Sequence, residues 1–184
     1  RNVFLIDSEN RSADMYADEF DFAKCDLTSF RPRVYVEAIR AAEAAGADVI
    51  VVDSLSHAWA GSDGALSLAD EAMVRYKGNK FAAWRDVTPE HNALVDAIVR
   101  CRAHIICTMR AKTAYELEKD EQGKVVPRKI GLAPVQRDGM EYEFDLVADM
   151  DHEHNFVVSK SRIRILDKAV IRMPDGTLGR QIRE

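Results

Sequence analysis

Three short apolar runs, each followed at once by polar residues, are the most regular feature of this chain. They span residues 3–6, 49–52 and 105–107, and they lead into Asp7, Asp53 and Thr108. Uninterrupted apolar runs of this length are typical of strands buried on both faces of a parallel sheet. Because the carboxyl ends of parallel strands meet at one edge, where open α/β sheets bind ligands, we expect the polar residues to gather there.

Helical periodicity fills the stretches between these runs. Residues 32–45 carry apolar residues at helical spacing and end at Gly46, which is a good helix stop. A strand, a helix and a strand in this order favour a parallel sheet with a crossover helix. A second helix is predicted over residues 65–76. A third is predicted to begin at Thr88 and Pro89, as cap and first position, and to run to about residue 101.

Turn residues and alternation predict the remaining elements of the first two thirds. Residues 57–64 carry two glycines and small polar side chains, which indicates a flexible loop, and residues 81–87 form either a short helix or a packed loop. Alternation over residues 113–126 around a central turn predicts an exposed β-hairpin. A basic loop punctuated by glycine and proline follows over residues 127–137.

The C-terminal third is predicted to form antiparallel strands over residues 143–150 and 154–159. The polar cluster between them has metal-ligand residue types, but a hairpin turn accounts for it better than a metal site. The chain is therefore predicted to be one α/β domain, residues 1–184. It has a mostly parallel sheet, a hairpin with its basic loop at 112–137, and antiparallel C-terminal strands.

Composition narrows the class of protein. At 184 residues, with 47% hydrophobic and 31% charged residues, the chain has the balance of a soluble globular domain. It contains no apolar run of membrane-spanning length and no signal peptide, so we expect a cytoplasmic protein without a membrane partner. The three cysteines lack metal-ligand spacing, and Cys101 and Cys107, which lie in apolar surroundings, are expected to be reduced core residues.

The charge argues against a generally basic nucleic-acid-binding surface, because the net value is −5. A local basic patch remains possible. The candidates for contact with DNA are Arg85, Arg128, Lys129 and Arg137. The loop that carries the last three can contact a phosphate backbone or a neighbouring subunit, or it can be a solvated linker.

The polar residues at the predicted sheet edge suggest phosphate chemistry. Asp53 can hold Mg²⁺, directly or through water, beside the phosphates of a nucleotide. Glu9, just beyond the first strand, can orient and activate a water molecule, although residues 8–10 can also simply turn the chain. Thr108 and Arg110 add a hydroxyl and a cation to the same edge.

The order of these features resembles the RecA-like ATPase core. Residues 3–10, VFLIDSEN, resemble the strand that ends in the catalytic glutamate, here Glu9. Residues 49–54, VIVVDS, resemble the Walker B strand, with Asp53 in the magnesium position and Ser54 beside it. Residues 105–110, IICTMR, resemble the strand whose end senses the γ-phosphate; Thr108 stands where the family usually has an amide, with Arg110 nearby. Residues 159–162, SKSR, resemble the K-x-R element whose lysine and arginine, here Lys160 and Arg162, reach a neighbouring subunit's nucleotide.

A closer likeness is to the RecA-like nucleotide-binding proteins of bacteriophages and prophages. Four long segments carry it, at residues 53–59, 81–92, 108–118 and 131–155. The resemblance implies a three-layer RecA-like core and implies ATP and Mg²⁺ as cofactors. It also implies a homo-oligomer that acts on single-stranded DNA in recombination or strand annealing.

One departure from the family is large. The 184 residues contain no G-x-x-x-x-G-K-[ST], the loop that cradles the β- and γ-phosphates. In the family this loop lies upstream of the strand that corresponds to residues 3–6. We therefore expect the parent protein to have a P-loop. This chain alone is expected to hydrolyse ATP poorly or not at all. Two alternatives remain open. One is a non-catalytic DNA-binding or assembly module, and the other is a replicative helicase motor, which rests only on the K-x-R element.

Overall fold

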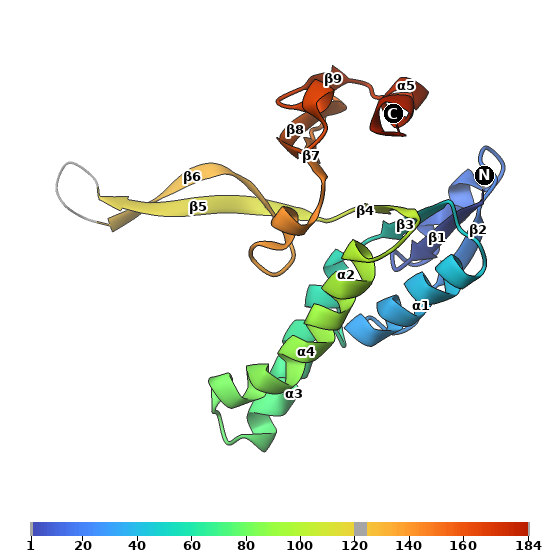
Figure 1. The fold of residues 1–184 in the computed structure, drawn as a ribbon. Helices are drawn as coiled ribbons and strands as arrows, with labels where there is room; N and C mark the ends of the chain where they lie inside the picture. The colour runs from blue at the N-terminus through green and yellow to red at the C-terminus, as the bar shows by residue number, and fades with distance from the viewer. Residues whose placement is uncertain (1, 120–124, 184) are drawn as a thin grey trace. The chain divides into compact units, whose positions relative to one another are not determined.

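The structure is a computed structural model that describes residues 2–119 and 125–183, with side chains described outside residues 114–130. The chain divides into two compact units, Arg1–Arg137 and Asp138–Glu184, and each is described by itself (Figure 1).

A four-stranded parallel sheet forms the centre of the first unit. Its strands are β1 (Val3–Asp7), β2 (Ala23–Asp26), β3 (Val49–Asp53) and β4 (His104–Cys107), in the order β2-β1-β3-β4. All three pairings are parallel, because each strand is followed by a crossover that returns the chain to the same end of the sheet. In the register, Asp7 lies beside Asp53 on one side and Asp26 on the other. The predicted α/β class and mostly parallel sheet are confirmed.

Helices bury one stripe each against this sheet and against one another. They are α1 (Pro32–Ala44), α2 (Ser56–Ala60), α3 (Ala65–Arg75) and α4 (Lys80–Val99), and a short 3₁₀ helix, η1 (Ser12–Tyr16), follows β1. Tyr35 and Ile39 of α1 are fully buried, as are Ile50 and Val52 of β3. α3 and α4 lie side by side (Figure 1) and share a small core around Leu68.

The sheet is less deeply buried than the apolar runs predict. In β3 every second residue is fully buried, and in β4 the pattern alternates between exposed and partly buried, with Ile106 53% exposed. The prediction of strands buried on both faces is therefore wrong for β4. Within the described residues β4 has a neighbour, β3, on one side only, so it is an edge strand.

α4 corrects the prediction that a helix begins at Thr88 and Pro89. The helix runs without interruption from Lys80, where the Asn79 side chain accepts a hydrogen bond from the Ala82 amide at 3.1 Å. Pro89 lies inside it and removes one helical hydrogen bond. The helix continues because its buried residues keep helical spacing on both sides of Pro89, so packing outweighs the local break. These residues are Ala83, Val87, His91, Leu94 and Ile98.

Residues 57–64 are not a flexible loop, as the two glycines suggested. Most of this stretch is α2 and the tight turn after it. A Cβ on Gly61 would lie 2.5 Å from the His57 carbonyl oxygen and 2.8 Å from the Phe30 ring, and Gly64 is equally crowded. The glycines are there because the backbone packs too closely for a side chain.

A long antiparallel hairpin completes the first unit. Its strands are β5 (Ala111–Lys119) and β6 (Val125–Pro134), with one register shift between Ala114 and Tyr115. The prediction of a basic loop over residues 127–137 is wrong for residues 127–134, because these residues belong to β6 and pair with β5.

The second unit is a small antiparallel sheet with short helices. It contains η2 (Met140–Glu143), β7 (Leu146–Met150), β8 (Asn155–Ser161), η3 (Arg164–Leu166), β9 (Val170–Arg172) and α5 (Gly176–Arg183). The strand order β7-β8-β9 confirms the predicted antiparallel C-terminal pair and adds a third strand. Its core is formed by Met140, Val158 and Leu166. No helix within the described residues has the length and apolarity needed to cross a membrane.

Candidate active site at the carboxyl edge of the sheet

The ends of β1, β3 and β4 bring five of the predicted residues to one edge of the first unit. Glu9 follows β1, and Asp53 and Ser54 end β3. Thr108 and Arg110 follow β4, which pairs with β3 up to Val52 and Cys107. Because the three strands are parallel neighbours, their carboxyl ends converge, as the sequence predicted.

Asp7 holds the turn that carries Glu9. Its side chain is only 1% exposed, and its two carboxylate oxygens accept hydrogen bonds from the amides of Glu9 at 2.7 Å and Ala13 at 3.1 Å. These two bonds fix the backbone just beyond β1. In the sequence Asp7 appears only as the polar residue that ends an apolar run, although a buried aspartate before a polar turn is a common way to satisfy free amides.

The Glu9 carboxylate is held from two sides. The Arg110 guanidinium donates to both of its oxygens, with the Nε–Oε1 distance at 3.1 Å. The Ser54 hydroxyl donates to Oε1 at 2.8 Å. Burial raises the pKa of Glu9, but the hydrogen bonds from Arg110 and Ser54 and the nearby positive charges of His57 and Arg110 more than offset this, and the pKa lies below its ordinary value.

Asp53 is the carboxylate best suited to a metal ion. Its Oδ1 accepts a hydrogen bond from the Thr108 hydroxyl at 2.5 Å, and the Asp53–Ser54 peptide bond is cis. Across the described residues, no group of three or more His, Cys, Asp or Glu side chains could hold a metal. A protein site with one carboxylate suits Mg²⁺, which is commonly bound through one or two carboxylates together with substrate phosphates and water. The residues therefore fit Mg²⁺ that arrives with a nucleotide.

His57 and Ser8 belong to the same site, although neither was among the residues predicted from the sequence. The Ser8 hydroxyl lies 2.9 Å from Nδ1 of His57, and that nitrogen is 3.8 Å from Oε1 of Glu9. The imidazole stacks on Phe30 with the ring centroids 4.8 Å apart. Only the fold brings residues 8, 30 and 57 together, so no local signal in the sequence marks them.

A second layer ties the site to the base of the hairpin. The Arg110 amide donates to the Ser56 hydroxyl at 2.9 Å, and the buried Gln136 amide donates to the Leu55 carbonyl at 3.1 Å. Gln136 also contacts Nε2 of His91 at 3.2 Å. Burial lowers the pKa of His91, whose Nδ1 has no hydrogen-bond partner within the described part of the chain. The hairpin therefore begins and ends on the segment that follows Asp53.

The remaining predicted residues lie outside this cluster. Arg85 is exposed on α4, and Arg137 follows Gln136 at the end of the first unit. Arg128 and Lys129 pair through their backbones in β6, and their side chains lie outside the described residues.

Lys160 and Arg162 lie in the second unit, where each has local partners. The Lys160 ammonium donates to the carbonyl oxygens of Glu141, Tyr142 and Phe144, at 3.3, 2.5 and 2.8 Å. Arg162 pairs with Asp145 at 2.7 Å, and both side chains are exposed. In this conformation Lys160 has used all three of its N–H donors to close the turn after η2.

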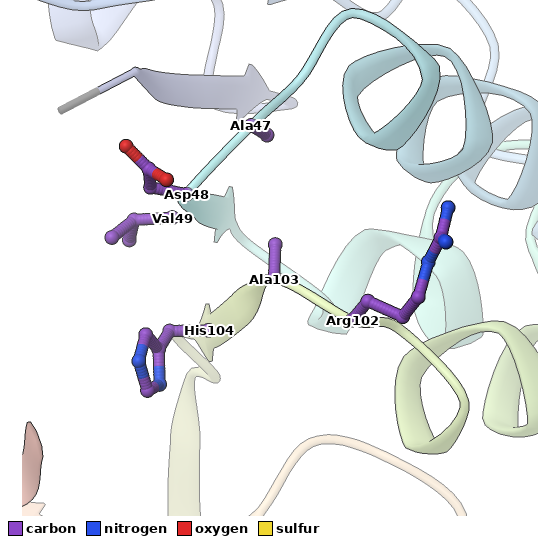
Figure 2. A pocket seen from close by; sticks show the side chains of 6 residues that line it. All are labelled: Ala47, Asp48, Val49, Arg102, Ala103 and His104. Atoms are coloured by element: carbon purple, nitrogen blue, oxygen red, sulfur yellow. The ribbon is translucent and has the colours of Figure 1, made fainter.

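A pocket at the opposite edge of the sheet is not part of this site. It lies at the amino ends of β3 and β4, and Figure 2 shows Asp48 and His104 on one side with the Arg102 side chain directed away from them. Arg102 is already paired with Glu43, to which its amide and its Nε donate at 2.9 and 3.3 Å.

Comparison with known proteins places the chain in a family. A family model described as "AAA domain" matches residues 1–170. The chain belongs to this AAA-domain family. The match covers the whole parallel sheet and most of the second unit. The cluster at the carboxyl edge of the sheet, called the carboxyl-edge cluster below, therefore lies in an ATPase-like, nucleotide-binding type of domain. It consists of Glu9, Asp53, Ser54, Thr108 and Arg110. No curated protein and no solved structure matches the chain.

Proposed function

We propose that this AAA domain is a RecA-like ATPase module in which the carboxyl-edge cluster binds and hydrolyses ATP. The observation that carries the proposal is that Glu9, just beyond β1, and Asp53, at the end of the adjacent parallel strand β3, lie at the same edge of the sheet. They are linked through Ser54 and flanked by Thr108 and Arg110. A carboxylate for the metal and a second carboxylate for the attacking water are two parts that phosphoryl transfer requires.

Each side chain has a distinct task in this proposal. Asp53, oriented by Thr108, holds Mg²⁺. Glu9 orients the attacking water and accepts its proton, a role for which its carboxylate must be at least partly free of Arg110. Arg110 is 58% exposed, so its own charge stays solvated if it turns from Glu9 toward a phosphate, while the Ser54 hydroxyl continues to donate to the Glu9 carboxylate. Mg²⁺-bound ATP supplies the phosphoryl group that is transferred.

The finer parts of the proposal rest on the resemblance to phage and prophage proteins. We propose single-stranded DNA as the partner, recombination or strand annealing as the process, and a homo-oligomer as the active form. Arg85, Arg128, Lys129 and Arg137 are the proposed DNA contacts. For Lys160 and Arg162 to serve a neighbouring subunit's nucleotide, they must first leave their partners in the second unit.

The test is made on the product of the whole gene, because the 184 residues contain no G-x-x-x-x-G-K-[ST]. ATP hydrolysis is measured with and without single-stranded DNA for the wild type, Glu9→Gln and Asp53→Asn. Both variants should lose turnover by about 10² or more, as is typical when a base or a metal ligand is removed. Asp26→Asn is the matched control, since Asp26 ends the neighbouring strand but lies outside the cluster. Wild-type turnover in both site variants would refute the assignment.

A non-catalytic DNA-binding or assembly module is the second candidate. One observation favours it, since both Glu9 oxygens are engaged by Arg110 and the carboxylate is a weakened base. Under this alternative the whole gene product binds nucleotide or DNA but turns over no ATP, and Arg110→Ala does not restore turnover. If Arg110→Ala releases activity, the ion pair is a resting state of an ATPase.

A further inference from the structure

His57 lies close enough to Glu9 to influence it and is far better shielded than Arg110. Its side chain is 17% exposed, against 58% for Arg110. The Phe30 ring covers one face of the imidazole, and Asp63 holds Phe30 in place by accepting a hydrogen bond from its amide at 2.7 Å. His57 is therefore enclosed within the site, whereas most of the Arg110 side chain faces solvent.

The Ser8 hydroxyl connects His57 to the end of β3. Its oxygen accepts from the Ser54 amide at 2.8 Å and lies 2.9 Å from both the Ser54 carbonyl oxygen and Nδ1 of His57. A hydroxyl has one proton and two lone pairs. All three contacts are satisfied if Ser8 donates to the Ser54 carbonyl and Nδ1–H of His57 donates to Ser8. The network thus assigns the proton of His57 to Nδ1.

Ser54, whose backbone the Ser8 hydroxyl binds, is also the residue that donates a hydrogen bond to Glu9. Ser54 is 2% exposed, its backbone is bound on both sides by Ser8, and its own hydroxyl donates to Oε1 of Glu9. Glu9 therefore has one exposed anchor, Arg110, and one buried anchor, Ser54, which Ser8 and His57 keep in position.

We propose that His57 is a positioning residue for Glu9. Through Ser8, His57 keeps the Ser54 hydroxyl directed at Oε1 of Glu9. The carboxylate then keeps its orientation toward the attacking water when Arg110 no longer pairs with it. This role rests on the proposed ATPase function. A displacement of about 1 Å at a reacting group can cost about 10² in rate, so loss of the buried anchor should be visible in turnover.

Three substitutions of His57 separate positioning from packing. In His57→Asn the side-chain amide can reach the place of Nδ1 and donate to Ser8. In His57→Gln the amide reaches the place of Nε2 instead, and in His57→Phe only the stacking on Phe30 remains. We expect kcat of the whole gene product to fall about 10- to 100-fold in the Phe and Gln variants with KM within about twofold, and to be largely kept in the Asn variant.

A second measurement needs no turnover and uses the chain Arg1–Glu184. The pKa of the Glu9 carboxyl is read by carbon NMR in the wild type and in the same three variants. It should rise more in the Phe and Gln variants than in the Asn variant, because only the Asn side chain keeps Ser8 and the Ser54 hydroxyl in place on Oε1, and that hydrogen bond lowers the pKa of Glu9. Circular dichroism identifies variants that unfold. If the Phe variant unfolds, the Glu9 pKa is compared between the Asn and Gln variants alone, because these two side chains have the same polar group.

The outcomes distinguish the two proposals. If Glu9→Gln keeps wild-type turnover, the proposed function fails. If Glu9→Gln abolishes turnover while His57→Phe and His57→Gln keep it, the function stands and the role of His57 is overturned. Equal loss of turnover in the Asn and Gln variants, or a Glu9 pKa that is the same in these two variants, also overturns the role. Loss in Gln and Phe with rescue by Asn supports it.

Discussion

Removing the buried Asp7 carboxylate should destabilise the first unit far more than removing any exposed carboxylate. Asp7 is 1% exposed, and its carboxylate oxygens accept hydrogen bonds from the amides of Glu9 and Ala13 at 2.7 and 3.1 Å. Hydrogen bonds to a charged group contribute about 1.5–3 kcal/mol each, so losing both in Asp7→Ala should cost about 3–6 kcal/mol. In Asp7→Asn one oxygen remains as an acceptor while the amide group faces an N–H, so about half of that cost is expected.

The assay is urea unfolding followed by tryptophan fluorescence. The sequence has two tryptophans, Trp59 and Trp84, which stack 5.5 Å apart in the first unit, so the signal reports that unit alone. A loss of about 3–6 kcal/mol is large against the 5–15 kcal/mol stability of a typical domain. Asp7→Ala is therefore expected to unfold at much lower urea, and Asp7→Asn provides the milder change.

The control is Asp26→Asn. Asp26 is the register partner of Asp7 on β2, but it is partly exposed and pairs with Lys24 at 2.8 Å and Arg11 at 3.5 Å. Such pairs contribute about 0–1 kcal/mol. If Asp7→Asn destabilises the unit no more than Asp26→Asn does, the two buried amide bonds are not the anchor of the Glu9 turn and the reasoning is refuted.

Three further predictions can be checked on the same chain. Pro89→Ala should raise the free energy of unfolding by up to about 3 kcal/mol, because an exposed position inside α4 regains a helical hydrogen bond; an unchanged urea midpoint would contradict this. The exposed Cys25 should react with a thiol reagent in the native protein. The partly buried Cys107, whose pKa burial raises to about 12, should react much more slowly than Cys25 until the protein is unfolded, as peptide mass spectrometry can show. Because the folded-state pKa of Glu9 lies below its ordinary value of 4.5, its pairing with Arg110 stabilises the protein above that value and is lost as the pH falls through the folded-state pKa. Unfolding from about pH 6 to about pH 3 should therefore depend less on pH in Glu9→Gln, and equal slopes would count against the pairing.

The errors in predicting the elements share a physical origin. Thr88 and Pro89 carry a strong local signal for a helix start, yet α4 passes through them, because burial of Ala83, Val87 and His91 along one face outweighs one lost hydrogen bond. The glycines at 61 and 64 indicated flexibility, whereas the fold uses them for close approach to the His57 carbonyl. Local propensity is a weak guide wherever packing decides the outcome.

The sequence predicted the candidate-site residues that follow the strand ends, but not the residues that hold them in place. Glu9, Asp53 and Thr108 follow apolar runs, so the sequence alone locates them once the runs are identified as parallel strands. His57 and Gln136 follow no such pattern. They come to the site from α2 and from the end of the hairpin, and no periodicity in the sequence indicates that they meet it.

The sequence by itself determined the α/β class, the parallel direction of three strands and the side chains at their carboxyl ends, whereas β2 and the order β2-β1-β3-β4 came from the structure. It could do so because apolar runs, crossover helices and polar strand ends are local features, and the geometry of a parallel sheet converts them into neighbours. Only the tertiary structure decided which groups hold Glu9, with Arg110 on its exposed side and Ser54, Ser8 and His57 on its buried side. Hydrogen bonds between residues 45 to 101 positions apart depend on how the layers pack, and packing is a property of the whole fold rather than of any stretch of sequence.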